Sequence, residues 1–214
     1  MTTKFLIDGP AAAKCTVLLA HGAGGPMDSP AMTGAAKALA DSGFRVARFE
    51  FGYMADRRSS ATRKPPPRAE KLGPEYLAAI DALRATEPVK GPLIIGGKSM
   101  GGRIASMVAD DLHAAGRIAG LLCLGYPFHP PGRPEQLRTA HLAKMKTPTL
   151  IVQGTRDPFG TRAEVATYTL SKAIEILWLE DGDHDLKPRK RVSGFSAADH
   201  LETAAQAAAA WATR

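Results

Sequence analysis

Short apolar runs alternate along this chain with segments whose apolar residues recur at helical spacing, and this alternation restricts the fold more than any other feature. The apolar runs lie at 4–7, 16–20, 46–51, 93–95, 121–124, 149–152 and 174–179. Helical spacing or helix caps mark 30–39, 76–83, 104–112, 161–171 and 197–211. Such alternation is typical of βαβ units. We therefore predict an α/β fold with three layers, in which helices flank a doubly wound, mainly parallel sheet of about six to seven strands.

The segment 52–73 interrupts this rhythm. It holds consecutive arginines and serines followed by three prolines at 65–67. Clusters of polar residues and proline are typical of loops, so we expect a long polar loop here.

A glycine-flanked serine, Gly97-Lys98-Ser99-Met100-Gly101, stands between the 93–95 strand and the 104–112 helix. A serine exposed on such a sharp turn needs small neighbours, because side chains two positions away on either side would clash. Ser99 is therefore our candidate nucleophile. A phosphate-binding loop is the alternative, but its pattern requires a glycine where this chain has Pro92.

A serine hydroxyl needs a base, and the base needs an orienting carboxylate. His184 follows the last predicted strand and Asp157 follows the strand before it, so both fall at the same edge of the sheet as Ser99. We predict the triad Ser99, Asp157 and His184. The other histidines after Ser99 lie in predicted helices, ahead of a strand or ahead of the candidate acid: His113, His129, His141 and His200.

Acyl transfer also needs two donors for the developing oxyanion. The backbone N–H of Met100 directly follows the nucleophile. The glycine-rich segment 21–25 follows the first long apolar run, and we expect it to supply the second donor, from Ala23 or, as second choice, Gly24.

The net charge of +7 is partly concentrated in two segments, 57–68 and 187–191. Both follow strands, so they could line the rim of the site and favour an anionic substrate. We name Lys98 and Phe128 as candidate substrate-binding residues. The alternative is a non-catalytic protein of the same fold that binds an acidic partner. We expect no nucleic-acid partner, because aromatic residues do not interleave the basic runs.

We expect no metal and no cofactor, since the chain lacks the usual zinc-ligand spacings such as CxxC and HExxH. No apolar run approaches the roughly 18 residues that a membrane span requires. The run at 16–20 is too short for a signal peptide. These features predict a cytoplasmic protein without a membrane partner.

Four motifs in order, HGAGG, GGKSMGG, GTRDPFG and DGDHD, resemble the α/β-hydrolase superfamily. The resemblance is narrower to the small capless branch near the dienelactone hydrolases and to bacterial hydrolases grouped with testis-expressed protein 30. The resemblance runs from about residue 15 to the C-terminus, and it implies no cofactor and an acyl-enzyme on Ser99. Because 214 residues suffice for one large domain and are few for two, we predict a single α/β-hydrolase domain over residues 1–214. Dienelactone hydrolases use a cysteine nucleophile where this chain has serine, so the resemblance does not imply a dienelactone substrate.

Overall fold

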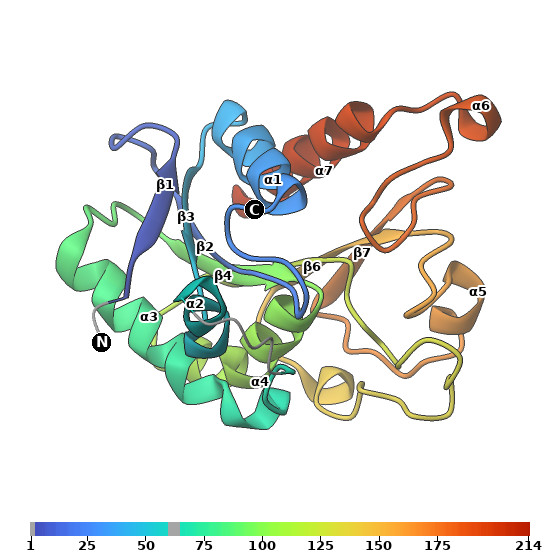
Figure 1. The fold of residues 1–214 in the computed structure, drawn as a ribbon, viewed down its shortest axis with the longest axis horizontal. Coiled ribbons are helices and arrows are strands. Elements are labelled where there is room, and N and C mark those ends of the chain that lie inside the picture. Colours follow the sequence, from blue (N-terminus) through green and yellow to red (C-terminus); the bar gives the residue numbers. More distant parts are fainter. Residues whose placement is uncertain (1–2, 60–64) are drawn as a thin grey trace.

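A seven-stranded sheet forms the centre of the computed structural model, which describes residues 3–59 and 65–214, and helices cover both of its faces (Figure 1). The strand order is β1-β3-β2-β4-β5-β6-β7. Strands β2 to β7 pair in parallel, and β1 pairs antiparallel with β3 at one edge. The predicted three-layer, mainly parallel α/β fold is therefore confirmed.

The strands match the apolar runs of the sequence because a parallel sheet is covered on both faces. The inner strands β2 to β6 are almost wholly buried. The strands are β1 (Phe5–Asp8), β2 (Thr16–Ala20), β3 (Arg45–Phe49), β4 (Leu93–Lys98), β5 (Gly120–Leu124), β6 (Thr149–Gly154) and β7 (Ile174–Leu179).

Four long helices build the two outer layers. Helices α1 (Pro30–Asp41) and α7 (Ala197–Ala212) lie side by side on one face of the sheet (Figure 1). Helices α3 (Gly73–Thr86) and α4 (Met100–Ala114) cover the other face. The helices of each layer pack a separate cluster of apolar side chains against the sheet, so the sheet divides the hydrophobic core into two parts. No helix among the described residues is long and apolar enough to cross a membrane.

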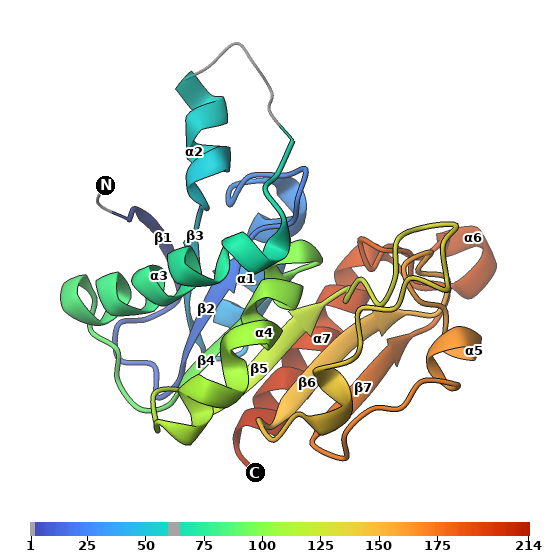
Figure 2. The same cartoon turned by 90° about the horizontal axis from the view of Figure 1, so that it is seen from below.

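Two predicted segments differ from the structure. Residues 52–59 are not a loop but helix α2 (Gly52–Ser59), which stands away from the sheet beyond β3 (Figure 2). Its buried Met54 anchors it, and eight residues are too few to show helical periodicity in the sequence. The helix predicted over 161–171 is limited to α5 (Arg162–Val165), where a Thr161–Glu164 capping box starts a single turn.

The remaining short elements are turns of helix between the longer ones. They are η1 (Ala69–Lys71), η2 (Leu142–Lys144) and α6 (Lys190–Ser193).

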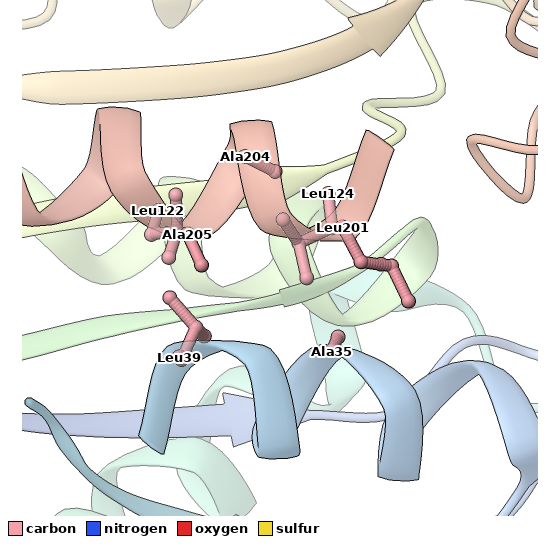
Figure 3. A pocket seen from close by; sticks show the side chains of 7 residues that line it. All are labelled: Ala35, Leu39, Leu122, Leu124, Leu201, Ala204 and Ala205. Atoms are coloured by element: carbon pink, nitrogen blue, oxygen red, sulfur yellow. The ribbon is translucent and has the colours of Figure 1, made fainter. Parts of the chain in front are cut away.

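A small apolar void of about 10 Å³ remains between α1, α7 and the sheet (Figure 3). Figure 3 shows Leu39 and Ala35 of α1 facing Leu201, Ala204 and Ala205 of α7 across it. A gap of this size holds at most about one water, and its walls offer no polar partner for one. The two helices therefore pack closely but leave slight freedom for the side chains between them.

Candidate active site

Ser99 occupies a sharp turn between β4 and α4. Its backbone has φ 51° and ψ −115°, a conformation that residues other than glycine rarely adopt. Ser99 N–H donates to the Leu124 carbonyl, and Arg103 N–H donates to the Ser99 carbonyl, so the turn is fixed from both sides. Strain of this kind is retained where the surrounding structure enforces it, and here it lifts the Ser99 side chain above the sheet edge.

The two flanking glycines permit this turn by close backbone contact. A Cβ at Gly97 would lie 2.8 Å from the Gly101 carbonyl carbon, and a Cβ at Gly101 would lie 2.6 Å from the His21 carbonyl oxygen. Real side chains do not tolerate such contacts with backbone. The crowding predicted from the sequence motif is therefore present in the structure.

A continuous hydrogen-bonded relay joins the three residues predicted to form the triad. The Ser99 hydroxyl lies 2.8 Å from His184 Nε2, and His184 Nδ1 lies 2.8 Å from Asp157 Oδ2. The three residues follow β4, β6 and β7, whose carboxyl ends meet at one edge of the sheet. Because a carboxylate only accepts, it fixes the proton on Nδ1 and leaves Nε2 free to accept from the serine.

Asp157 is fully buried and saturated with donors. Besides His184, it accepts from Gln153 Nε2 at 2.9 Å and from the Phe159 N–H at 2.9 Å. Sequence reasoning missed Gln153, although a glutamine in the otherwise apolar β6 strand is a usable signal. These donors compensate the cost of burying a carboxylate and hold it in one orientation.

The aromatic side chain at this site is Phe159, not Phe128. Phe159 stacks on the His184 ring with 4.1 Å between centroids. Phe128, predicted to contact substrate, is fully buried and packs against Tyr126 and Tyr168. It does not line the cavity beside Ser99. The prediction for Phe128 is corrected accordingly, since a buried ring cannot meet a ligand there.

The predicted oxyanion donors belong to residues that adjoin Ser99 in the chain or line the cavity beside it. Met100 is the first residue of α4, so its N–H has no partner within the helix. Ala23 and Gly24 lie in the loop after β2 and line the cavity that contains Ser99 and His184. Within the described residues, no backbone acceptor is recorded for the N–H of Met100, Ala23 or Gly24.

This cavity has a volume of about 450 Å³ and opens to solvent. Its walls come from the 21–25 loop, the first turn of α1, the serine turn and the loop after β7. The lining residues are Gly22, Ala23, Gly24, Gly25, Ser29, Pro30, Ala31, Met32, Lys98, Ser99, Phe159, His184, Asp185 and Lys187.

Comparison with known proteins identifies the family of this chain. The family described as alpha/beta hydrolase domain matches residues 13–213, nearly the whole chain. The chain belongs to this α/β-hydrolase family. A curated relative from Rattus norvegicus, named "Putative protein-lysine deacylase ABHD14B", is 29% identical over 154 residues, which are 70% of this chain and 65% of the relative. The chain thus matches slightly less than two thirds of that relative's length.

Two solved hydrolase structures share the fold. The dienelactone hydrolase of Anabaena variabilis superposes with a TM-score of 0.73 at 22% identity, over 98% of this chain and 90% of that one. A Xanthomonas campestris α/β serine hydrolase without a lid gives a TM-score of 0.67 at 23% identity, over 96% and 87% of the two chains. Together, the family match and the shared fold identify the chain as an α/β-hydrolase.

A second serine–histidine contact in this α/β-hydrolase joins Ser106 to His141 Nε2 at 2.8 Å. Ser106 is only 3% exposed, lies inside α4, and donates to the Arg103 carbonyl. Among the described residues, no carboxylate hydrogen-bonds to His141. Neither Ser106 nor His141 lines the 450 Å³ cavity. This contact therefore satisfies buried polar groups, whereas the Ser99 relay opens on a space that a ligand can enter.

Lys98, predicted to bind substrate, already has partners. Its ammonium group donates to the His184 carbonyl at 2.7 Å and pairs with Asp185 at 3.0 Å. The side chain is 11% exposed. Lys98 borders the cavity, but its charge joins the serine turn to the histidine loop.

The two basic segments differ in their relation to the site. Arg58 pairs with Asp28 and with Glu50. In the second segment, Arg189 pairs with Asp181, whereas Lys187 lines the cavity. Two further basic residues of the first segment lie outside the described residues: Arg63 and Lys64.

Proposed function

We propose that this α/β-hydrolase cleaves a small ester or thioester through an acyl-enzyme on Ser99. The observation that carries the proposal is the Asp157–His184–Ser99 relay, which ends at the floor of an open cavity of about 450 Å³. A buried carboxylate, a tautomer-fixed imidazole and a hydroxyl within 2.8 Å of it are the parts that an activated serine requires.

In the acylation half of the reaction, Ser99 Oγ attacks the carbonyl carbon of the substrate while its proton passes to His184 Nε2. The carbonyl oxygen becomes negative and accepts from the N–H of Met100 and from the 21–25 loop. When the carbon–leaving group bond breaks, the proton on His184 goes to the departing alkoxide or thiolate. The acyl group then remains as an ester on Ser99.

In the deacylation half, water attacks the same carbon and gives a proton to His184 Nε2. The tetrahedral species collapses, the bond to Ser99 Oγ breaks, and that proton returns to the serine. A carboxylic acid leaves. Asp157 stays ionised throughout and stabilises the imidazolium that forms twice in the cycle.

The cavity favours a small acyl group of mixed character. The first turn of α1 contributes Pro30, Ala31 and Met32, and Phe159 contributes an aromatic face. Lys98 is mostly buried and pairs closely with Asp185, whereas Lys187 is 57% exposed and lies 3.7 Å from the same carboxylate, so Lys187 is the lysine that an anionic acyl group would meet. If the substrate is anionic, the KM for a negatively charged ester should rise with salt concentration, whereas the KM for a neutral ester of equal size should not.

The name of the rat relative points to acyl-lysine as a second acyl donor. Amide and ester cleavage share the same acyl-enzyme, so an acylated-lysine peptide belongs in the substrate panel beside the esters. Ester turnover without peptide turnover would restrict the proposal to esters and thioesters.

The deciding experiment is reaction with a fluorophosphonate, followed by intact mass and peptide mapping. We expect one adduct per chain on Ser99, which is lost in Ser99→Ala and in His184→Ala. Ser106→Ala is the matched control, because Ser106 also contacts a histidine but does not line the cavity. Labelling that survives in Ser99→Ala and is lost in Ser106→Ala would refute the assignment. A folded protein without any adduct would favour the non-catalytic, acidic-partner-binding alternative.

A further inference from the structure

The loop that carries the candidate oxyanion donors is held by a tyrosine from helix α2. The Tyr53 hydroxyl donates to the Ala23 carbonyl at 3.1 Å. The described chain contains no cis peptide bond, so the carbonyl of Ala23 and the N–H of Gly24 point in opposite directions across their shared planar unit. Tyr53 therefore fixes the direction of the Gly24 N–H, away from α2.

His21 fixes the preceding peptide in the same manner. Its Nε2 accepts from the Phe51 N–H at 3.2 Å, so the proton resides on Nδ1, which donates to the Gly22 carbonyl at 2.7 Å. The N–H of Ala23 then points away from the His21 ring. Because the His21 and Tyr53 rings are neighbours, 5.7 Å apart, the two carbonyls are drawn towards one pair of side chains.

Ala23 and Gly24 both line the cavity beside Ser99, whereas Tyr53 and His21, which hold the two carbonyls, do not. We propose that Tyr53 is a positioning residue, which acts through the Ala23–Gly24 peptide to hold the loop N–H groups towards the oxyanion formed on Ser99. This inference rests on the proposed serine hydrolase function.

Tyr53 is itself well fixed. The guanidinium of Arg57 lies over its ring at 5.1 Å from the centroid, and Met54 anchors the same helix in the core. Burial raises the pKa of Tyr53 to about 12, with a smaller opposing effect from Arg57. The hydroxyl accordingly remains a donor at every pH at which an esterase is assayed.

The test is Tyr53→Phe, which removes the hydroxyl and keeps the ring. Tyr168→Phe is the matched control, because the Tyr168 hydroxyl is buried without a partner in the described residues. We expect kcat to fall in Tyr53→Phe by roughly five- to fifty-fold, less than the roughly 10²–10³-fold cost of deleting an oxyanion donor outright. KM should stay within about twofold, since the substrate in its ground state carries no oxyanion.

A trifluoromethyl ketone supplies a readout that a merely structural role would not change. It forms a tetrahedral, oxyanion-bearing adduct on an activated serine, so its dissociation constant should rise in Tyr53→Phe by the same factor as kcat falls. In the wild-type adduct, the Gly24 amide proton should move downfield in the NMR spectrum, a measurement that does not depend on how the variant folds.

Equal kcat and ketone affinity in Tyr53→Phe and wild type, with Ser99 still labelled by fluorophosphonate, would overturn the role of Tyr53 and leave the proposed function intact. A Gly24 amide that does not move would also overturn it. Wild-type protein that neither labels nor turns over would instead refute the proposed function, and this inference with it.

Discussion

Replacing Lys98 by methionine separates two roles that the sequence alone could not distinguish. Methionine retains much of the apolar stem of the lysine and loses the ammonium group. In the structure that group donates to the His184 carbonyl at 2.7 Å and pairs with Asp185 at 3.0 Å. If Lys98 serves chiefly to hold the histidine loop, the variant should alter kcat and stability. If it binds an anionic substrate, the variant should alter KM.

The expected size follows from these two contacts. A hydrogen bond from a charged donor contributes about 1.5–3 kcal/mol, and the lysine end of this one is mostly buried. The Asp185 carboxylate is 47% exposed, so screening leaves the ion pair itself worth less than about 1 kcal/mol. We therefore expect Lys98→Met to lower the free energy of unfolding by about 2 kcal/mol.

The same contact should govern turnover. The 183–187 turn has bonds of its own, from Asp185 N–H to the Asp183 carboxylate and from Leu186 N–H to the Asp183 carbonyl. It should therefore persist in the variant but lose its fixed distance to the serine turn. If about 1.4 kcal/mol of the contact positions the imidazole, kcat falls roughly tenfold, with little change in KM.

Urea unfolding and steady-state kinetics on a neutral and an anionic ester of matched size provide the assay. Lys187→Met is the control, because Lys187 also lines the cavity but is 57% exposed and lies 3.7 Å from Asp185. It should change stability by less than about 0.5 kcal/mol. Unchanged kcat and stability in Lys98→Met, with a raised KM for the anionic ester alone, would refute this reasoning and restore Lys98 as a substrate-binding residue.

Three further outcomes follow from single contacts. In Asp157→Asn, an amide replaces a carboxylate that accepts only, so the imidazole of His184 is no longer held in the tautomer that accepts from Ser99. We expect kcat to fall by about 10³–10⁴ while the fold persists. Turnover close to that of the wild type would contradict the relay. Gly34→Ala adds a methyl group that favours the helix and lies 3.1 Å from the tip of Leu201, which borders the void in Figure 3 and can move into it. The free energy of unfolding in urea should therefore rise by up to about 1 kcal/mol. A decrease would show that Leu201 cannot move. Burial lowers the pKa of His21 in the folded protein below its ordinary 6.5. As the pH falls below 6.5, the unfolded chain therefore binds a proton on this histidine before the folded protein does, and the free energy of unfolding should decrease. Equal free energies of unfolding at pH 7.5 and 5.5 would contradict a neutral, buried His21.

The strands were predictable because burial leaves a direct trace in the sequence. Strand β2 was predicted at 16–20 and β7 at 174–179, and the structure has the same bounds. Helix α2 left no such trace. Among residues 52–58, whose burial the structure describes, only Met54 is buried, and the polar remainder of the helix has the composition of a loop. A short helix that meets the core with one side chain is invisible to a periodicity argument.

The two predicted substrate-binding residues have different surroundings in the structure, for different physical reasons. Phe128 and Phe159 both follow strand ends, and the sequence does not show which ring turns inward. Gly160 decides this in the structure, because a Cβ there would lie 2.7 Å from the Phe128 ring, so the glycine admits Phe128 into the core. Lys98 was correctly placed beside the cavity, but its partners come from a loop 86 residues later. Pairings over that distance are not encoded in local pattern.

The local sequence pattern does predict the catalytic side chains, because the parallel sheet places the ends of its strands together. Ser99, Asp157 and His184 each follow a parallel strand, and the carboxyl ends of parallel strands meet at one edge, so their order along the chain was enough to bring them together. The donors for the oxyanion carry no side-chain signature, because they are backbone N–H groups. Their direction is set by His21 and Tyr53, of which one lies inside the glycine-rich motif and the other on the helix that the pattern missed. The side chains of the proposed reaction can thus be recognised in the sequence. The residues that orient the backbone N–H groups towards the oxyanion can be found only in the structure.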